Sequence, residues 1–392
     1  MKQTIRYCYI TTISLMTLLM TSLPNQAGEI TEWNMLNVIT DPGPYIPEFT
    51  YQSHIYDDEF LSHELGSVIW VESDVMSPGL GIVNNDDVNG SNCVMTAGVN
   101  PNDLTVKQCS DPFQSSKRFK LSTTSTGGVL DLVFDVDLAG GVSKPYRFLA
   151  KYLNSTNRTI SDIRIEPGFG LGGDFVPAPG GMGLDFSDRD GVIWMADVNT
   201  GETDSINLDA LFPFGLFGDA ATDPNHDLDG YFDATDRARF NLRANRGQII
   251  STGISANYHN VFGDFLAKSQ AISGYFWDHD DDDETDPYLI AHQTEAGWYT
   301  LRPDQWWLDF MLPIPDTNLL DGSIAESTLN DWAANPDDFG IDLIEDLANL
   351  NLNFHLTIGD ISTWPGYDSI SETAQFTLRV SSFSVIFANG FD

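Results

Sequence analysis

The residues best suited to chemistry lie in one acidic stretch, positions 223–236, which reads Asp-Pro-Asn-His-Asp-Leu-Asp-Gly-Tyr-Phe-Asp-Ala-Thr-Asp. Calcium takes about six to eight oxygen ligands, and loops that bind it often turn sharply at a glycine in the sixth position. With Gly230 at that position, the predicted calcium ligands are Asn225, Asp227, Asp229, the carbonyl of Tyr231, Asp233 and Asp236. Asn at the first position and Asp instead of Glu at the last depart from the usual pattern. The alternative is a solvated acidic turn.

A second acidic run follows an aromatic segment and lacks the glycine of a calcium loop. Crowded carboxylates repel each other unless a cation or water screens them. The run therefore predicts either a second cation site or a solvated charge cluster. The ligands of such a site would be Asp278, Asp280, Asp282, Glu284 and Asp286.

Signals for catalysis are weak. The seven histidines show no metalloprotease spacing, and the chain has no Gly-x-Ser-x-Gly motif. Two carboxylates could cleave a glycosidic bond, but 57 acidic residues make such a pair inevitable. We therefore assign no catalytic residue and favour a non-enzymatic function. The alternative is a secreted polysaccharide hydrolase with Trp306 or Trp307 in its cleft.

The first 27 residues resemble a secretory signal. Lys2 and Arg6 precede an apolar run, which a Pro-Asn pair ends before Ala27. The run is short for a membrane anchor, and no second apolar span follows. We expect cleavage near Ala27, no transmembrane segment afterwards, and a mature protein outside the cell or on its outer surface. The periplasm is the alternative location.

Export explains the cysteines and fits the charge. Cys8 leaves with the signal, so Cys93 and Cys109 are expected to form a disulfide in an oxidising compartment. Removing Lys2 and Arg6 leaves 17 basic against 57 acidic residues, a net charge of −40. Such a surface repels nucleic acids and anionic membranes, whose binding requires Lys and Arg. We expect an extracellular ligand of unknown identity, for example a glycan or a surface protein.

Strand signals dominate the remaining chain. At 129–138, apolar residues alternate with Asp131, Asp135 and Asp137, which predicts a strand with an acidic face in solvent. Segments 146–153 and 159–166 predict an antiparallel hairpin, and a change of parity at 381–382 predicts a bulge or a bend. Only 336–350 suggests a helix.

Frequent strands and few helices predict a mainly β fold, a jelly-roll or immunoglobulin-like β-sandwich with long loops. We expect one extracellular domain over residues 28–392. Its part 28–116 is predicted to be loop-rich, and 117–392 to hold the main β region.

Several short motifs occur in an order that resembles the bacterial "choice-of-anchor F" family. They are Tyr-Arg-Phe-Leu at 146–149, Gly-Phe-Gly at 168–170, Gly-Leu-Phe-Gly at 215–218, Gly-Tyr-Phe-Asp at 230–233, Phe-Gly-Asp at 262–264 and Gly-Tyr-Phe-Trp-Asp at 274–278. The resemblance implies a secreted or surface-displayed protein and no assigned activity. The tail at 387–392 is either a display tag of a Gram-negative bacterium or an ordinary chain end.

These features together predict a calcium-stabilised binding or structural module. The alternatives are the hydrolase and a calcium-dependent adhesion or matrix component.

Overall fold

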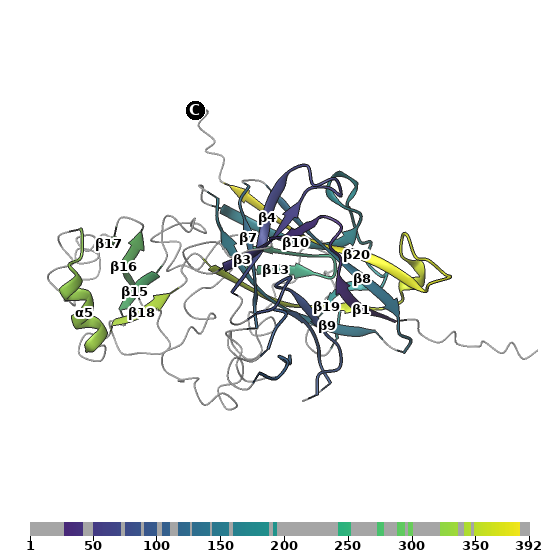
Figure 1. The fold of residues 1–392 in the computed structure, drawn as a ribbon, viewed down its shortest axis with the longest axis horizontal. Coiled ribbons are helices and arrows are strands. Elements are labelled where there is room, and N and C mark those ends of the chain that lie inside the picture. Colours follow the sequence, from purple (N-terminus) through teal and green to yellow (C-terminus); the bar gives the residue numbers. More distant parts are fainter. Residues whose placement is uncertain are drawn as a thin grey trace, which may run out of the picture.

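The computed structural model describes residues 27–41, 50–71, 75–87, 90–99, 104–109, 117–125, 128–141, 143–156, 160–187, 191–193, 242–251, 273–277, 288–294, 297–300, 322–335, 341–345 and 349–384. They form three β-sheets with few short helices (Figure 1). The strands are β1 (Gly28–Trp33), β2 (Val38–Thr40), β3 (Thr50–Tyr56), β4 (Glu64–Val71), β5 (Gly81–Val83), β6 (Asn92–Met95), β7 (Phe119–Thr123), β8 (Val129–Leu138), β9 (Lys144–Asn154), β10 (Ile160–Phe169), β11 (Val176–Pro177), β12 (Leu184–Ser187), β13 (Leu242–Asn245), β14 (Gln248–Ser251), β15 (Ser273–Trp277), β16 (Tyr288–Thr294), β17 (Gly297–Thr300), β18 (Ile341–Glu345), β19 (Asn349–Ile358) and β20 (Thr373–Ser384). The helices are η1 (Gly172–Asp174), α5 (Glu326–Ala334) and η3 (Ile361–Thr363).

Two large sheets form the expected β-sandwich. The seven-stranded sheet has the order β1-β8-β20-β10-β14-β13, with β11 paired to β10. The nine-stranded sheet has the order β12-β19-β9-β7-β4-β3-β2, and β6 joins β9 to β5. Most neighbours are antiparallel, but β6 and β7 both run parallel to β9 and pair with successive parts of it. The mainly β prediction is confirmed.

Aromatic side chains fill the space between the two sheets. Phe134 stacks on Phe376 within the seven-stranded sheet at 5.1 Å between ring centroids, and Phe148 stacks on Phe354 within the nine-stranded sheet at 5.0 Å. Phe134 and Phe148 then meet edge to face across the sandwich at 5.7 Å. Offset and edge contacts of this kind are the favoured geometries of aromatic pairs. They explain the apolar alternation that the sequence shows along β8 and β20.

A third, four-stranded sheet has a core of its own. Its order is β17-β16-β15-β18, and α5 contributes the fully buried Trp332. Tyr275 packs on Trp332 and Trp298 at 5.0 Å each. Trp298 therefore belongs to this core, while its neighbour Tyr299 is exposed. The single-domain organisation stays a prediction.

The expected hairpin between 146–153 and 159–166 is wrong. Both segments are strands, but β9 lies in the nine-stranded sheet and β10 in the seven-stranded one, where β10 pairs with β14 and β20. The intervening segment crosses from one sheet to the other. Alternation shows only that each strand has one buried face. Two strands in opposite sheets that face the same core show the same pattern as two paired strands in one sheet.

Two local expectations also fail. Residues 341–345 of the predicted helix form β18, because pairing with β15 overrides the helical spacing. No bulge occurs at 381–382: β20 keeps its register with β10 there, and Phe383 on the outer face is exposed. The region 28–116 contributes the six strands β1 to β6, and its loop-rich character stays a prediction.

Candidate binding groove

A groove of about 890 Å³ lies on the outer face of the seven-stranded sheet, across β1, β8 and β20. Its floor follows the cross-strand register, in which Asp135 lies opposite both Glu32 and Gln375, and Asp137 lies opposite Thr373. The segment after η3 contributes Pro365 and Gly366 to its wall. The full lining is Thr31, Glu32, Asp135, Asp137, Phe169, Gly170, Pro365, Gly366, Thr373, Ala374 and Gln375.

Asp135 occupies the centre of the groove in a fixed orientation. The side-chain amide of Asn34 donates to both of its carboxylate oxygens at 3.0 Å, and the amide of Gln375 donates to Oδ1 at 2.7 Å. Asp135 therefore presents a preorganised acceptor, while Glu32 and Asp137 beside it are exposed.

A buried ion pair anchors the segment that borders the groove at Gly170. Arg379 donates from Nε and Nη2 to the two oxygens of Asp131, at 2.7 Å each, and from Nη2 to the carbonyl of Gly172 at 2.6 Å. The amide of Gly172 donates back to Asp131 at 2.8 Å. At Gly170, φ is +86° and an added Cβ would lie 2.4 Å from the carbonyl of Asp174, so the position requires glycine.

The prediction that Asp131 lies on a solvated acidic face of β8 is wrong. The residue is only 2% exposed. Asp135 and Asp137 do lie on an accessible face, and they line the groove. Signals for the groove were therefore present in the sequence, but only the fold brings Glu32 and Gln375 to the same place.

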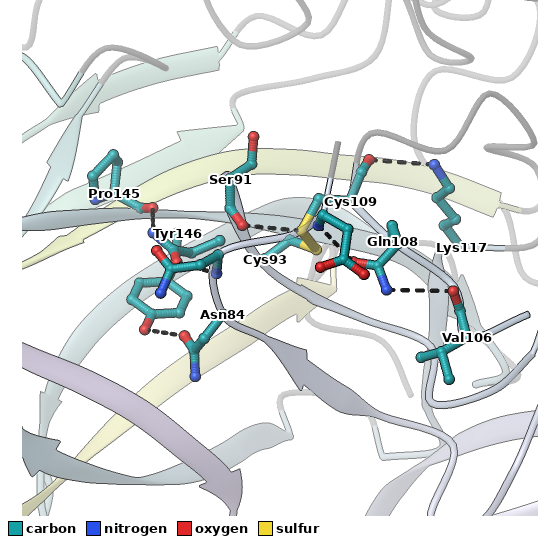
Figure 2. The surroundings of a disulfide bond; sticks show 12 residues. Asn84, Ser91, Cys93, Val106, Gln108, Cys109, Lys117, Pro145 and Tyr146 are labelled. Carbon is teal, nitrogen blue, oxygen red and sulfur yellow. Dashed lines mark hydrogen bonds between the residues drawn. A yellow bond between two sulfur atoms is a disulfide. The ribbon is translucent and has the colours of Figure 1, made fainter. Parts of the chain in front are cut away.

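Figure 2 shows the predicted disulfide, which the structure confirms between Cys93 and Cys109. It ties the segment after β6 to that strand. At the base of the segment, the amide of Thr96 donates to the carbonyl of Lys117 at 2.8 Å. The ammonium of Lys117, which is 1% exposed, donates to the carbonyl of Cys109 at 3.2 Å. Residues 97–116 thus leave the sheet and return to it at one point.

Tyr146, also labelled in Figure 2, joins the two sheets through a polar contact. Its hydroxyl accepts from the amide of Ile30 in β1 at 3.0 Å and donates to Oδ1 of Asn84 at 2.5 Å. The amide of Asn84 donates to the carbonyl of Ile30 at 2.8 Å. Both backbone groups of Ile30 are therefore satisfied beside the irregularity of β1, which falls between Ile30 and Glu32.

His54 lies between two carboxylates at the edge of the nine-stranded sheet. Its Nδ1 is 2.8 Å from Glu64 and its Nε2 is 3.0 Å from Asp41. Burial alone would lower the pKa of His54, but the hydrogen bonds and charges of Glu64 and Asp41 raise it above the ordinary 6.5. Because both acceptors are carboxylates, the doubly protonated ring satisfies both contacts.

One serine lies opposite a histidine, but the pair does not form an accessible nucleophile. Ser187 in β12 is in register with His355 in β19. Ser187 is fully buried, and its hydroxyl accepts from Thr357 at 2.8 Å. A nucleophilic hydroxyl must reach a substrate and pass its proton to a base.

The predicted metal ligands lie outside the described residues. This holds for Asn225, Asp227, Asp229, Tyr231, Asp233 and Asp236, and for the second run Asp278, Asp280, Asp282, Glu284 and Asp286. Trp306, Trp307 and the tail at 387–392 lie outside them as well. Within the part of the chain that is described, no group of three or more His, Cys, Asp or Glu side chains could hold a metal ion.

Comparisons of the chain with protein-family models, curated proteins and solved structures find no match. None of the helices in the described ranges is both long and apolar enough to span a membrane.

Proposed function

We propose that the protein is an exported binding module that recognises a hydroxyl-rich ligand, a glycan, in the groove across β1, β8 and β20. The observation that carries this proposal is Asp135, which two amide groups hold in one orientation at the centre of the groove. Carboxylates accept hydrogen bonds, whereas hydroxyls and amides both donate and accept. A floor of Asp, Glu, Gln and Thr side chains therefore complements a ligand with many hydroxyl groups.

A glycan array with the mature protein tests this proposal. Asp137→Asn keeps the shape of an exposed lining residue but changes an acceptor oxygen to a donor. We expect about tenfold weaker binding, since one lost hydrogen bond corresponds to about 1.4 kcal/mol. Glu59→Gln, which removes the same charge from an exposed loop outside the groove, is the matched control. Equal binding by wild type and Asp137→Asn, or no binding on the array, would contradict the proposal.

Export remains part of the proposal and is supported by the apolar N-terminal run and the disulfide. Ala27 bears on the cleavage site: it is 1% exposed, and its carbonyl accepts from Ala139 and Gly140 at 3.0 and 3.1 Å. We therefore propose cleavage on the N-terminal side of Ala27. N-terminal sequencing of the secreted protein measures it, and a chain that starts at Gly28 would contradict it.

Calcium binding by residues 225–236 also remains a proposal, supported by the spacing of their oxygens. A ligand that binds only the native state stabilises it by about 2.7 kcal/mol at a hundred times its dissociation constant. We expect chelation to lower the melting temperature and Asp229→Asn to reduce that response. Calorimetry on metal-stripped protein is the direct assay, and no heat of binding at millimolar calcium would refute the site.

A further inference from the structure

The groove across β1, β8 and β20 carries negative charge that no described side chain neutralises. Glu32, Asp135 and Asp137 line it, and none of the described residues in the lining is Lys, Arg or His. The carboxylate of Asp135 receives hydrogen bonds only from the neutral amides of Asn34 and Gln375, and the carboxylates of Glu32 and Asp137 have no partner within the described ranges. Strand pairing also places Glu32 directly opposite Asp135, an arrangement in which like charges destabilise a sheet.

Elsewhere on the same sheet, acidic side chains are paired with cations. Asp131, on the same strand and face as Asp135, accepts from two nitrogens of Arg379 at 2.7 Å each. Glu29, which lies opposite Asp137, pairs with Lys144. The three acids without a cationic partner thus gather where this face is concave. A cleft lined by charge of one sign focuses its field and concentrates ligands of the opposite sign.

A metal ion does not fit this arrangement. Within the part of the chain that is described, no group of three or more His, Cys, Asp or Glu side chains could hold one. Asp135 and Asp137 are two positions apart on one strand, which separates them by roughly 7 Å, and Glu32 lies on the neighbouring strand. A ligand that meets all three must spread its positive charge over several bonds, as an organic molecule with more than one amino group does.

We propose that the ligand of the groove is a glycan with free amino groups, of the kind formed by linked glucosamine units. The proposal rests on the glycan-binding function proposed above, to which it adds the charge of the ligand. Protonated amino groups would donate to Glu32, Asp135 and Asp137, and the ring hydroxyls would exchange hydrogen bonds with Gln375 and Thr373. One ligand then satisfies both the carboxylates and the neutral polar side chains of the lining.

Two tetrasaccharides that differ only in charge test the proposal by titration calorimetry on the mature protein. The glucosamine tetramer carries an amino group on every ring, whereas its N-acetylated counterpart has the same rings and no charge. At about pH 5.5, amines are protonated and carboxylates ionised. We expect the glucosamine tetramer to bind at least about tenfold more tightly, the factor for a hydrogen bond between charged groups. Added salt should weaken its binding.

The outcomes separate this proposal from the function on which it rests. Equal binding of the two tetramers would overturn the amino-glycan assignment but leave the groove as a glycan site. Binding of only neutral or acidic glycans on the array would do the same. An array on which nothing binds would overturn both. Tighter binding of a tetralysine peptide than of the glucosamine tetramer would indicate a basic protein segment as the ligand and overturn the assignment to a saccharide.

Variants show whether the groove, and not the acidic surface as a whole, attracts the amine. Glu32→Gln keeps the side-chain length and should weaken binding of the glucosamine tetramer about fivefold, the factor for an exposed ion pair. It should not lower the melting temperature, because it removes a like charge opposite Asp135. Glu59→Gln removes the same charge from an exposed loop outside the groove and should bind as the wild type does. Equal loss in both variants would show general attraction to the acidic surface and overturn the proposal, as would wild-type binding by Glu32→Gln.

Discussion

Replacing Tyr146 by Phe removes one oxygen from the contact that joins the two sheets. The ring remains in the core, so the change tests the hydroxyl alone. Burial raises the pKa of this hydroxyl, which therefore stays protonated and can donate to Asn84. Without it, the amide of Ile30, a fully buried residue, loses its acceptor, and Asn84 loses a donor that water can partly replace.

The expected cost follows from that asymmetry. Leaving one buried backbone donor unsatisfied costs about 1–3 kcal/mol, so we expect a loss of about 2 kcal/mol in the free energy of unfolding. For a mature chain of about 365 residues, an unfolding entropy of about 2.1 cal/mol/K per residue means that the melting temperature should fall by about 2–3 °C. Urea unfolding followed by tryptophan fluorescence measures the free energy, and thermal unfolding measures the shift.

Tyr367→Phe is the matched control. Tyr367 is partly buried against the same core, and its hydroxyl makes no hydrogen bond within the described ranges. Its replacement removes the same atom and should change the free energy of unfolding by less than about 0.5 kcal/mol. If both variants lost the same stability, the contact with Ile30 would contribute nothing and the reasoning would be refuted.

Three further predictions concern the histidine at the sheet edge, the disulfide and the buried ion pair. Protonated His54 should contribute about 1 kcal/mol or less to the free energy of unfolding. Because its pKa is raised in the folded state, this contribution is fully present below about pH 6.5 and is lost as pH rises through the folded-state pKa. The melting temperatures of wild type and His54→Gln should therefore converge with rising pH. Replacing Cys93 and Cys109 by Ser opens a loop with a sequence separation of 16 and should cost about 3 kcal/mol, measured by urea unfolding. Arg379→Met should cost about 3–5 kcal/mol, because it leaves buried Asp131 unpaired, and Asp131→Leu in the same chain should restore most of the loss.

Each of these has an outcome that would contradict it. A difference between wild type and His54→Gln that is constant from pH 5.5 to 9 would exclude a protonation effect. Unchanged unfolding of the cysteine variant would mean that the Thr96 and Lys117 hydrogen bonds alone hold the segment. A double variant no more stable than Arg379→Met would show that the ion pair is not the source of the loss.

Local sequence patterns predicted where strands form better than they predicted which strands pair with each other. The segment 129–138 coincides with β8, because alternation follows directly from one buried face. Its Asp131 could not be recognised as buried, since the compensating Arg379 lies 248 residues away in the sequence. The hairpin failed for the same reason: β9 and β10 each show their own faces, but the sheet to which each belongs depends on distant strands such as β19 and β20.

The candidate sites divide in a similar way. The disulfide was predictable because only two cysteines remain after the signal. Acidic residues of the groove were visible as a pattern, but the pattern gave no reason to separate Asp135 from the other acids.

The segment between β6 and β7 has a consequence for how this chain can vary. Its two ends are adjacent, since Thr96 donates directly to the carbonyl of Lys117, and β6 and β7 already lie end to end along β9. The sheet would keep its order if the segment carried a longer insert that leaves Cys109 in place. Chain ends that meet in this way tolerate insertion with little entropic cost, so the position between Val99 and Leu104, where an insert leaves Cys109 paired with Cys93, is the natural point to graft an affinity tag or a fluorescent domain.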